Sequence, residues 1–405
     1  MKKIFFILVI FISFLIILDV TNTNNKLYKK IDEEKIYIDE LYIYGRYLNI
    51  KGHSNFNFEN TFLVFIDNNF NEKLYDVFIN NNEFYISDKI NGGLNLEEID
   101  DSFTILLKNN DKYYSFINMS SYKKTDYYSL NKNNKSNYLL FYFDKFKDAY
   151  FLKLDSKIVD TPSDVYDIVI DPGHGGYDVG AINGSVYESN INLSISLKLK
   201  EKLEENGFKV KLTRDDNTNP NPYGKNGRAT SAYETKSKLF ISVHVNSSSN
   251  PLITGGVEVY ASKNMNYDFA YNLASKVKEY ANTTFSPLQA YKVKDGVYVK
   301  TLTESEIKNA KVDAENNGYS YYENVTTDTP WYFYNRETGG YMTGAYMDGR
   351  NKLYPKNDYY NSNMGVEGYL LELGYITCKK DLDNLVNNQD GYVTGIVKAF
   401  VEKIK

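Results

Sequence analysis

The sequence has very little cysteine and histidine, which limits the crosslinks and metal sites that it can form. Cys378 is the one cysteine among 405 residues, so the chain has no internal disulfide and no cysteine-rich zinc or iron–sulfur motif. The three histidines are His53, His174 and His244. A metal site must therefore combine histidine with carboxylates, which makes each histidine informative.

An excess of positive charge is also missing. The chain has 47 lysines and arginines against 52 aspartates and glutamates, a net charge of −5. It therefore offers no sequence-wide attraction to phosphates, and nucleic acid is excluded as the expected partner. Hydrophobic residues make up 42% and charged residues 24%, which is ordinary globular usage. At roughly 150 residues per domain, the length predicts two or three domains.

Proline is absent before Pro162, and only four of the 25 glycines precede residue 160. This change of composition predicts a domain boundary near residue 160. Residues 30–155 contain short aromatic and β-branched runs separated by Asn and Asp clusters, which predict a small β-sandwich-like accessory domain. It contains no catalytic constellation, so we expect it to act in spacing or binding.

The first 25 residues have the pattern of an export segment. Lys2 and Lys3 precede an apolar run over residues 4–18. As a helix this run reaches only about 22 Å, short of the roughly 30 Å of a bilayer core, which favours a cleaved signal peptide. No small-residue cleavage site follows, so a retained membrane anchor is the alternative. Both predict an exported, extracytoplasmic protein whose N-terminal segment contacts the membrane.

Residues 165–405 alternate between strand-like and helix-like segments, which predicts an α/β domain with a mostly parallel open sheet flanked by helices. Strands are expected at 166–170, 208–212, 239–243, 256–260 and 368–372, and helices at 191–206, 269–280 and 393–404.

The segment at about 285–365 does not fit this alternation and carries the only tryptophan, Trp331. We expect it to be an insertion at the rim of the site, with Trp331 stacking on substrate. Alternatively, a helix within 303–315 would block the metal with Glu304 or Glu306.

Two of the three histidines follow predicted strands. His174 lies in a glycine-rich turn after 166–170, and His244 follows 239–243. Open α/β sheets hold their sites at the carboxyl ends of strands. Glu188 lies between them in sequence, at the expected start of a helix. A His, Glu, His set leaves one position of a tetrahedral Zn²⁺ open, which is typical of a catalytic site.

Glu372 is the fourth candidate. It is expected to end an apolar strand at the same edge, and a carboxylate in a buried strand needs a partner or a function. Glu367 lies five residues earlier and is expected on the opposite face. Taken singly, a glycine-rich turn with one histidine is usually only a turn, and a glutamate at a helix start usually caps it. The combination is much more specific.

Four segments resemble a known family, the zinc-dependent N-acetylmuramoyl-L-alanine amidases of the type 3 catalytic fold, which cleave bacterial peptidoglycan. The resembling segments are residues 170–181, residues 212–215 with Arg228, residues 240–246 and residues 371–377. The resemblance implies that His174, Glu188 and His244 bind Zn²⁺ and that Glu372 is the catalytic carboxylate. Cys378 stands where the family usually has asparagine, which puts substrate contacts in doubt.

The function implied is hydrolysis, by zinc-activated water, of the amide between the muramoyl lactyl group and L-alanine of peptidoglycan. Three alternatives stay open: a zinc peptidase that cuts within the stem peptide, a catalytically silent wall-binding protein, and an adhesin that uses the β-rich region. Asn246 is expected to orient substrate or cap its turn. Arg214 and Arg228 are possible substrate contacts, although structural salt bridges are favoured for both.

Overall fold

The computed structural model describes residues 24–405 except for residues 35, 56–57, 87–93, 118–123, 221–226, 229–230, 251–252, 254, 263–266, 317–326, 328–365 and 405. Most of the predicted export segment and Trp331 lie outside the described residues. Within these ranges, no helix has the length and apolar character needed to cross a membrane.

The N-terminal region begins with a short helical stretch at residues 24–28 and otherwise consists of strands and one short 3-10 helix. Its elements are β1 (Ile36–Tyr44), β2 (Tyr47–His53), β3 (Thr61–Ile66), β4 (Glu72–Asp76), β5 (Phe78–Asn80), β6 (Glu83–Ile86), β7 (Leu94–Asn95), η1 (Leu96–Glu98), β8 (Phe103–Asn109), β9 (Lys112–Tyr114), β10 (Phe116–Ile117), β11 (Thr125–Tyr128), β12 (Lys135–Phe146) and β13 (Ala149–Asp160). The prediction of a β-rich region is confirmed.

Hydrogen bonding joins these strands into one sheet of 13 strands, in which β4-β3-β8-β13-β10-β1-β2-β6-β5 is the main path. This differs from the two separate sheets of a simple sandwich. Alternate residues of β3 enter different cores: Leu63 and Phe65 join one buried cluster, and Val64 and Ile66 join another. The period of two in a strand places these pairs on opposite faces, so both faces of β3 are buried.

The C-terminal region contains a seven-stranded sheet in the order β17-β14-β18-β22-β19-β21-β20. The strands are β14 (Ile168–Pro172), β17 (Val210–Leu212), β18 (Leu239–Asn246), β19 (Glu258–Tyr260), β20 (Lys292–Lys294), β21 (Val297–Tyr298) and β22 (Glu367–Tyr375). β17, β14, β18 and β22 run parallel to one another, but β19 is antiparallel to β22. The sheet is therefore mixed: the strand expected at 256–260 forms as β19, but it runs antiparallel to its neighbour β22.

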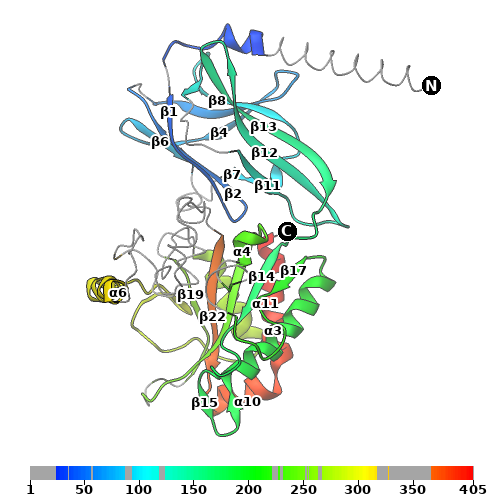
Figure 1. The fold of residues 1–405 in the computed structure, drawn as a ribbon, viewed down its shortest axis with the longest axis vertical. Coiled ribbons are helices and arrows are strands. Elements are labelled where there is room, and N and C mark those ends of the chain that lie inside the picture. Colours follow the sequence, from blue (N-terminus) through cyan, green and yellow to red (C-terminus); the bar gives the residue numbers. More distant parts are fainter. Residues whose placement is uncertain are drawn as a thin grey trace, which may run out of the picture.

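Helices flank this sheet (Figure 1). They are α3 (Glu188–Glu205), α4 (Ser231–Glu234), α5 (Asp268–Tyr280), α6 (Glu304–Asn316), α10 (Lys379–Asn387) and α11 (Gln389–Ile404). Apolar residues of α3, α5 and α11 share one buried cluster with alternate strand residues such as Ile168 and Ile170. Val169, between them, joins a smaller cluster with Ala232 of α4. The two faces of the sheet are thus covered by different elements.

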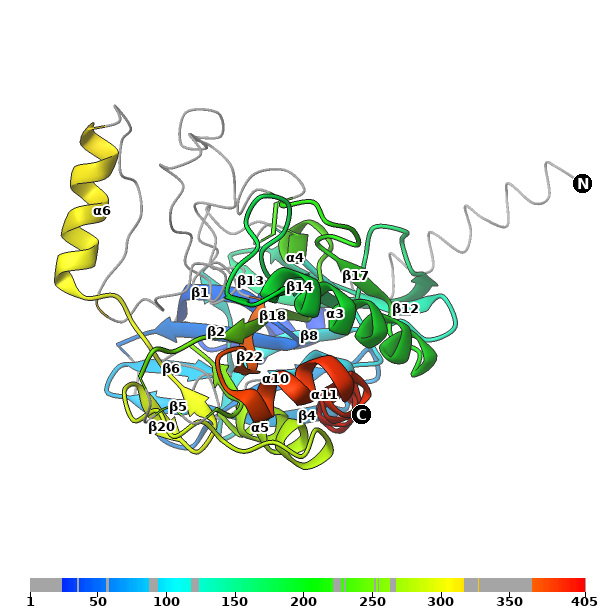
Figure 2. The same ribbon diagram turned by 90° about the horizontal axis from the view of Figure 1, so that it is seen from below.

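The predicted insertion begins later than expected. Val297 and Tyr298 are fully buried and form strand β21, which pairs with β19 inside the sheet. The segment that leaves the sheet follows them, and its first element is the predicted helix, α6. Both ribbon views show α6 standing away from the sheet (Figures 1 and 2). The carboxylate of Glu306 accepts hydrogen bonds from the backbone and hydroxyl of Thr303, at 2.7 and 2.8 Å. This is the capping box of a helix start, so the Glu306 carboxylate is engaged at the start of its own helix.

The two regions contact each other at the amino ends of the parallel strands (Figure 1). Asp167 and Lys238, which directly precede β14 and β18, are buried with their charged atoms 3.6 Å apart. The Asp167 carboxylate also accepts a hydrogen bond from the backbone of Asn131, at 3.1 Å. Leu130 packs into the core of the C-terminal region. The β-rich region therefore covers the edge opposite the carboxyl ends of β14 and β18.

Candidate metal centre

The turn after β14 presents His174 in an unusual backbone conformation. His174 has a φ of 59°, and Gly175 and Gly176 follow with φ of 136° and 58°. Backbone hydrogen bonds between Gly175 and Asp178, at 2.7 and 3.0 Å, close the turn. Asp178 then folds back, and its carboxylate lies 2.9 Å from Nδ1 of His174. Because a bond at one ring nitrogen orients the other, Nε2 of His174 is directed away from Asp178 and is available for a ligand role.

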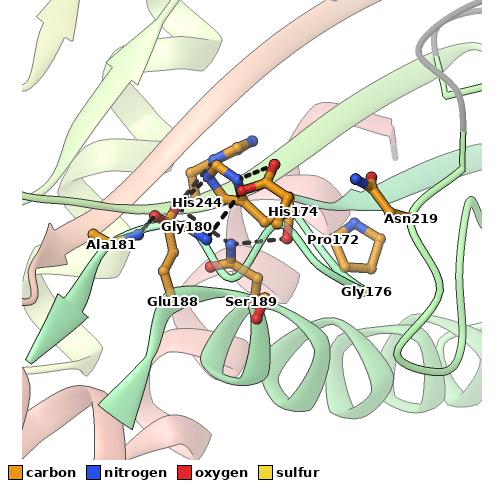
Figure 3. Close-up of polar contacts among 12 residues, drawn as sticks. Pro172, His174, Gly176, Gly180, Ala181, Glu188, Ser189, Asn219 and His244 are labelled. Atoms are coloured by element: carbon orange, nitrogen blue, oxygen red, sulfur yellow. Dashed lines mark hydrogen bonds and ion pairs between the residues drawn. The ribbon is translucent and has the colours of Figure 1, made fainter. Parts of the chain in front are cut away.

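Glu188 is the first residue of α3, as expected, and its side chain turns back toward the sheet (Figure 3). Oε2 accepts a hydrogen bond from the backbone of Ala181, at 2.8 Å, and Oε1 accepts one from the backbone of Val245, at 3.1 Å. Asn192, one turn later, donates to the Gly173 carbonyl at 3.2 Å. The buried carboxylate is thereby fixed between the two histidine-bearing segments.

His244 lies within β18, which continues to Asn246. The residue is 8% exposed, and its ring occupies the space next to Gly173. A Cβ atom at position 173 would stand 2.3 to 2.6 Å from three atoms of the ring. Only glycine at this position leaves room for His244 in its observed place.

The structure brings His174, Glu188 and His244 together (Figure 3). Oε1 of Glu188 is 3.2 Å from Nε2 of His174 and 3.1 Å from Nδ1 of His244. Ligand atoms about 2.0–2.1 Å from a tetrahedral zinc are separated by about 3.4 Å, so the spacing fits such an ion. Although burial opposes it, hydrogen bonding to the two imidazoles holds the pKa of Glu188 well below its usual value. The carboxylate is therefore ionised and ready to bind a cation at neutral pH.

Glu372 lies beside this cluster, on β22. It is the register partner of His244 on one side and of Glu258 on the other. Its side chain is buried, and Oε2 has no hydrogen-bond partner among the described residues. Burial and the charges of Glu188 and Glu258 raise the pKa of Glu372 well above its usual value. The strand does not end at Glu372 as expected but continues to Tyr375.

Glu367 lies at the other end of β22, where its carboxylate contacts the Lys403 ammonium at 2.6 Å. It therefore belongs to a different environment from Glu372.

Glu258 was missed by the sequence analysis. It is fully buried on β19 and accepts hydrogen bonds from Asn246 at 3.1 Å, from the Tyr260 hydroxyl at 2.9 Å and from the Tyr375 hydroxyl. The sequence signal that could have found Glu258 is a single carboxylate within an otherwise apolar strand. Asn246 uses its other amide atom to accept from the backbone of Ser247, at 2.8 Å. These contacts favour the turn-capping interpretation of Asn246 over substrate binding.

Arg214 and Arg228 do not extend toward a substrate. They are 3% and 1% exposed, and both donate to backbone carbonyls of the His174 turn. Arg228 also forms a buried ion pair with Asp171, at 2.8 Å. The salt bridge favoured by the sequence analysis is thus present for Arg228. Arg214 has no carboxylate within 4.0 Å among the described residues and bonds to carbonyl oxygens instead.

Comparison with known proteins points to one family. The family model described as N-acetylmuramoyl-L-alanine amidase matches residues 168–315, a range that contains His174, Glu188 and His244 but ends before Glu372. The germination-specific N-acetylmuramoyl-L-alanine amidase of Bacillus subtilis is 30% identical over 107 residues, covering 24% of this chain and 45% of the relative. The amidase LytC of the same organism is 36% identical over 110 residues, which cover 27% of this chain and 20% of LytC. These matches support placing this region with the amidases.

The similarity is partial in each case. The chain spans about half or less of the length of these curated relatives. Among solved structures, the amidase AmiC2 of Nostoc punctiforme covers 60% of this chain and 97% of its own, with 21% identity and a TM-score of 0.36. The match to Cwp6 from Clostridium difficile covers 60% of this chain and 30% of Cwp6, with 23% identity and a TM-score of 0.38.

Proposed function

We propose that the protein is a zinc-dependent peptidoglycan amidase that hydrolyses the bond between the muramoyl lactyl group and L-alanine. The observation that carries the proposal is the cluster of His174, Glu188 and His244 beside a buried carboxylate, Glu372. Three protein ligands leave a fourth position for water or substrate, as catalytic zinc sites do. The amidase family match over residues 168–315 supports the choice of substrate.

The ligand atoms fit zinc in kind as well as spacing, since imidazole nitrogen and carboxylate oxygen are its usual ligands besides thiolate. Bound there, zinc would supply Lewis-acid polarisation of the scissile carbonyl and of a water molecule. The negative charge of Glu188 has no lysine or arginine within 4.0 Å among the described residues. A divalent cation bound there would offset this negative charge.

Glu372 is assigned the proton transfers. With a cation bound to offset the neighbouring negative charges, Glu372 would be ionised and its unpartnered Oε2 would be free to accept a proton from the attacking water. It would then donate that proton to the leaving nitrogen of L-alanine. The amide needs this second transfer because an unprotonated amine anion is a very poor leaving group. The hydrogen bonds between Asp178 and His174 and between Val245 and Glu188 keep the ligand atoms in place during these steps.

We further propose that residues 1–25 export the chain or anchor it in the membrane, so that it acts outside the cytoplasm. Residues 165–405 form the catalytic domain of the proposal, and residues 30–155 its accessory domain. The amidase relatives are named for a bond of the cell wall, which supports this location.

The test compares Glu372→Gln with Glu367→Gln in the full chain, using purified peptidoglycan as substrate. We expect Glu372→Gln to lose on the order of 10²–10⁴-fold in rate, the usual loss for a positioned general base, with zinc content retained. Glu367→Gln should keep both the wild-type rate and the wild-type zinc content, because Glu367 lies at the opposite end of β22.

Identification of the new chemical ends decides between functions. A free L-alanine amino terminus supports the amidase. A new end within the stem peptide would indicate a peptidase, and a wild-type protein that binds peptidoglycan without hydrolysing it would contradict the proposal.

A further inference from the structure

The conformation of His174 must be held by its surroundings. Its φ of 59° places a residue with a side chain in the left-handed region, which costs roughly 1–2 kcal/mol. Three consecutive backbone carbonyls, those of Pro172, Gly173 and His174, point toward buried guanidinium groups. The source of this restraint is therefore the pair of arginines rather than the turn alone.

Arg214 reaches both ligand-bearing segments. Its Nε donates to the carbonyl of Pro172 at 2.9 Å, and its Nη2 donates to the carbonyl of Gly173 at 2.9 Å. The same Nη2 donates to the carbonyl of Ser189 at 2.9 Å. Ser189 follows Glu188 on α3, and Gly173 precedes His174. One guanidinium group thus ties the backbone beside one proposed ligand to the backbone beside another.

Arg228 has a different setting. It donates to the carbonyls of Pro172 at 2.7 Å and His174 at 2.6 Å, but it also pairs with Asp171, which accepts from Thr213 and Ser242 as well. Loss of Arg228 would leave a buried carboxylate without its cation, so its removal is expected to disturb the fold itself.

Arg214 has no such directly paired carboxylate among the described residues. It is 3% exposed and has no carboxylate within 4.0 Å among the described residues. Burial and the charge of Arg228 lower its pKa to about 10, so it remains protonated at neutral pH. A buried cation that bonds only to carbonyls gains less stability than a paired one. Its contacts instead serve to fix the distance between two backbone segments.

We propose that Arg214 is a positioning residue of the metal centre, which sets the separation of His174 and Glu188 without touching substrate. A planar fork of donors is required, because the Pro172, Gly173 and Ser189 carbonyls are reached from two different nitrogens. A lysine keeps the charge but presents its donors from a single atom. This inference rests on the proposed zinc site.

The experiment measures zinc affinity directly, by competition with a chromophoric chelator, in full-length Arg214→Lys and Arg214→Met. The unfolding temperature of each metal-free protein and the kcat and KM on soluble muropeptide are measured alongside. We expect the zinc dissociation constant to rise about 10–100-fold in both variants, while metal-free unfolding changes little and KM at saturating zinc is unchanged. Arg46→Lys, the same change in the β-rich region, is the matched control.

Each other outcome overturns the proposal. Lower stability of the metal-free protein with unchanged zinc affinity would mean a purely structural role. Restoration of zinc affinity by lysine would mean that charge alone matters, and a lower kcat with normal zinc affinity would place Arg214 in the reaction instead. Absence of zinc binding by the wild-type chain would refute the proposed metal site, a result distinct from failure of the variants.

Discussion

Replacing Gly173 with alanine would place a methyl group against the ring of His244. The added Cβ would lie 2.3 Å from Cε1, 2.4 Å from Nε2 and 2.6 Å from Nδ1 of the ring. Ordinary carbon contacts begin at about 3.5 Å, so the ring and the turn must separate by about 1 Å. Metal–ligand distances tolerate only about 0.2 Å. The displacement is therefore several times larger than a zinc site accepts.

The turn is poorly able to move away. Arg214 holds the carbonyl of Gly173, and Asn192 bonds to the same oxygen. We therefore expect His244 to be displaced and the zinc dissociation constant to rise by on the order of 100-fold, the upper end of the effect of losing an outer-sphere partner. The fold should lose only the roughly 1–3 kcal/mol typical of overpacking.

Chelator competition and thermal unfolding of the metal-free protein measure the two effects separately. Gly184→Ala is the control, because a Cβ there meets nothing within 4 Å; its φ of 60° adds only local strain of roughly 1 kcal/mol. A folded Gly173→Ala variant with wild-type zinc affinity would refute the reasoning, since it would show that His244 is not a ligand in this position.

Two further predictions concern buried charges. Burial raises the pKa of Glu372 in the folded state. The stability of the metal-free protein should therefore fall as pH rises from about 4.3, the pKa of an unfolded glutamate, through the pKa of folded Glu372. Glu372→Gln should remove this fall, and identical pH profiles of thermal unfolding for the variant and the wild type would contradict the prediction. Lys238→Met removes the cation that faces Asp167 between the two regions. We expect the free energy of unfolding, measured by chemical denaturation, to fall by about 3 kcal/mol and proteolysis near residue 160 to become faster. An unchanged free energy of unfolding and an unchanged proteolysis rate would show that the pair does not hold the regions together.

Most elements of the C-terminal region were predictable because their signals are local. The apolar stripe of residues 393–404 follows the period of a helix, and α11 covers it. The β-branched run before Asp171 forms β14. Helix α6 and the start of α3 at Glu188 were also anticipated. In each case the pattern depends on residues within a few turns of one another, which the sequence displays directly.

The mistaken expectations concern pairing between distant segments. A strand at residues 256–260 was expected in a mostly parallel sheet, but the antiparallel direction of β19 depends on contact with β22, more than 100 residues later. The same applies to β21, which was assigned to the insertion although it is buried in the sheet. The direction and order of strands depend on which strand edges pair in the folded sheet. The local composition of each strand does not specify that pairing.

The sequence by itself determined the candidate ligands, since a chain with three histidines and one cysteine has few ways to bind zinc, and two histidines follow apolar strands. Only the tertiary structure decided how they are held. The buried Arg214, the opposed Glu258 and Glu372, and the space that Gly173 leaves for His244 all arise from contacts across separate strands and turns. Such contacts depend on distances between atoms remote in sequence, which are fixed only when the sheet and its helices pack together.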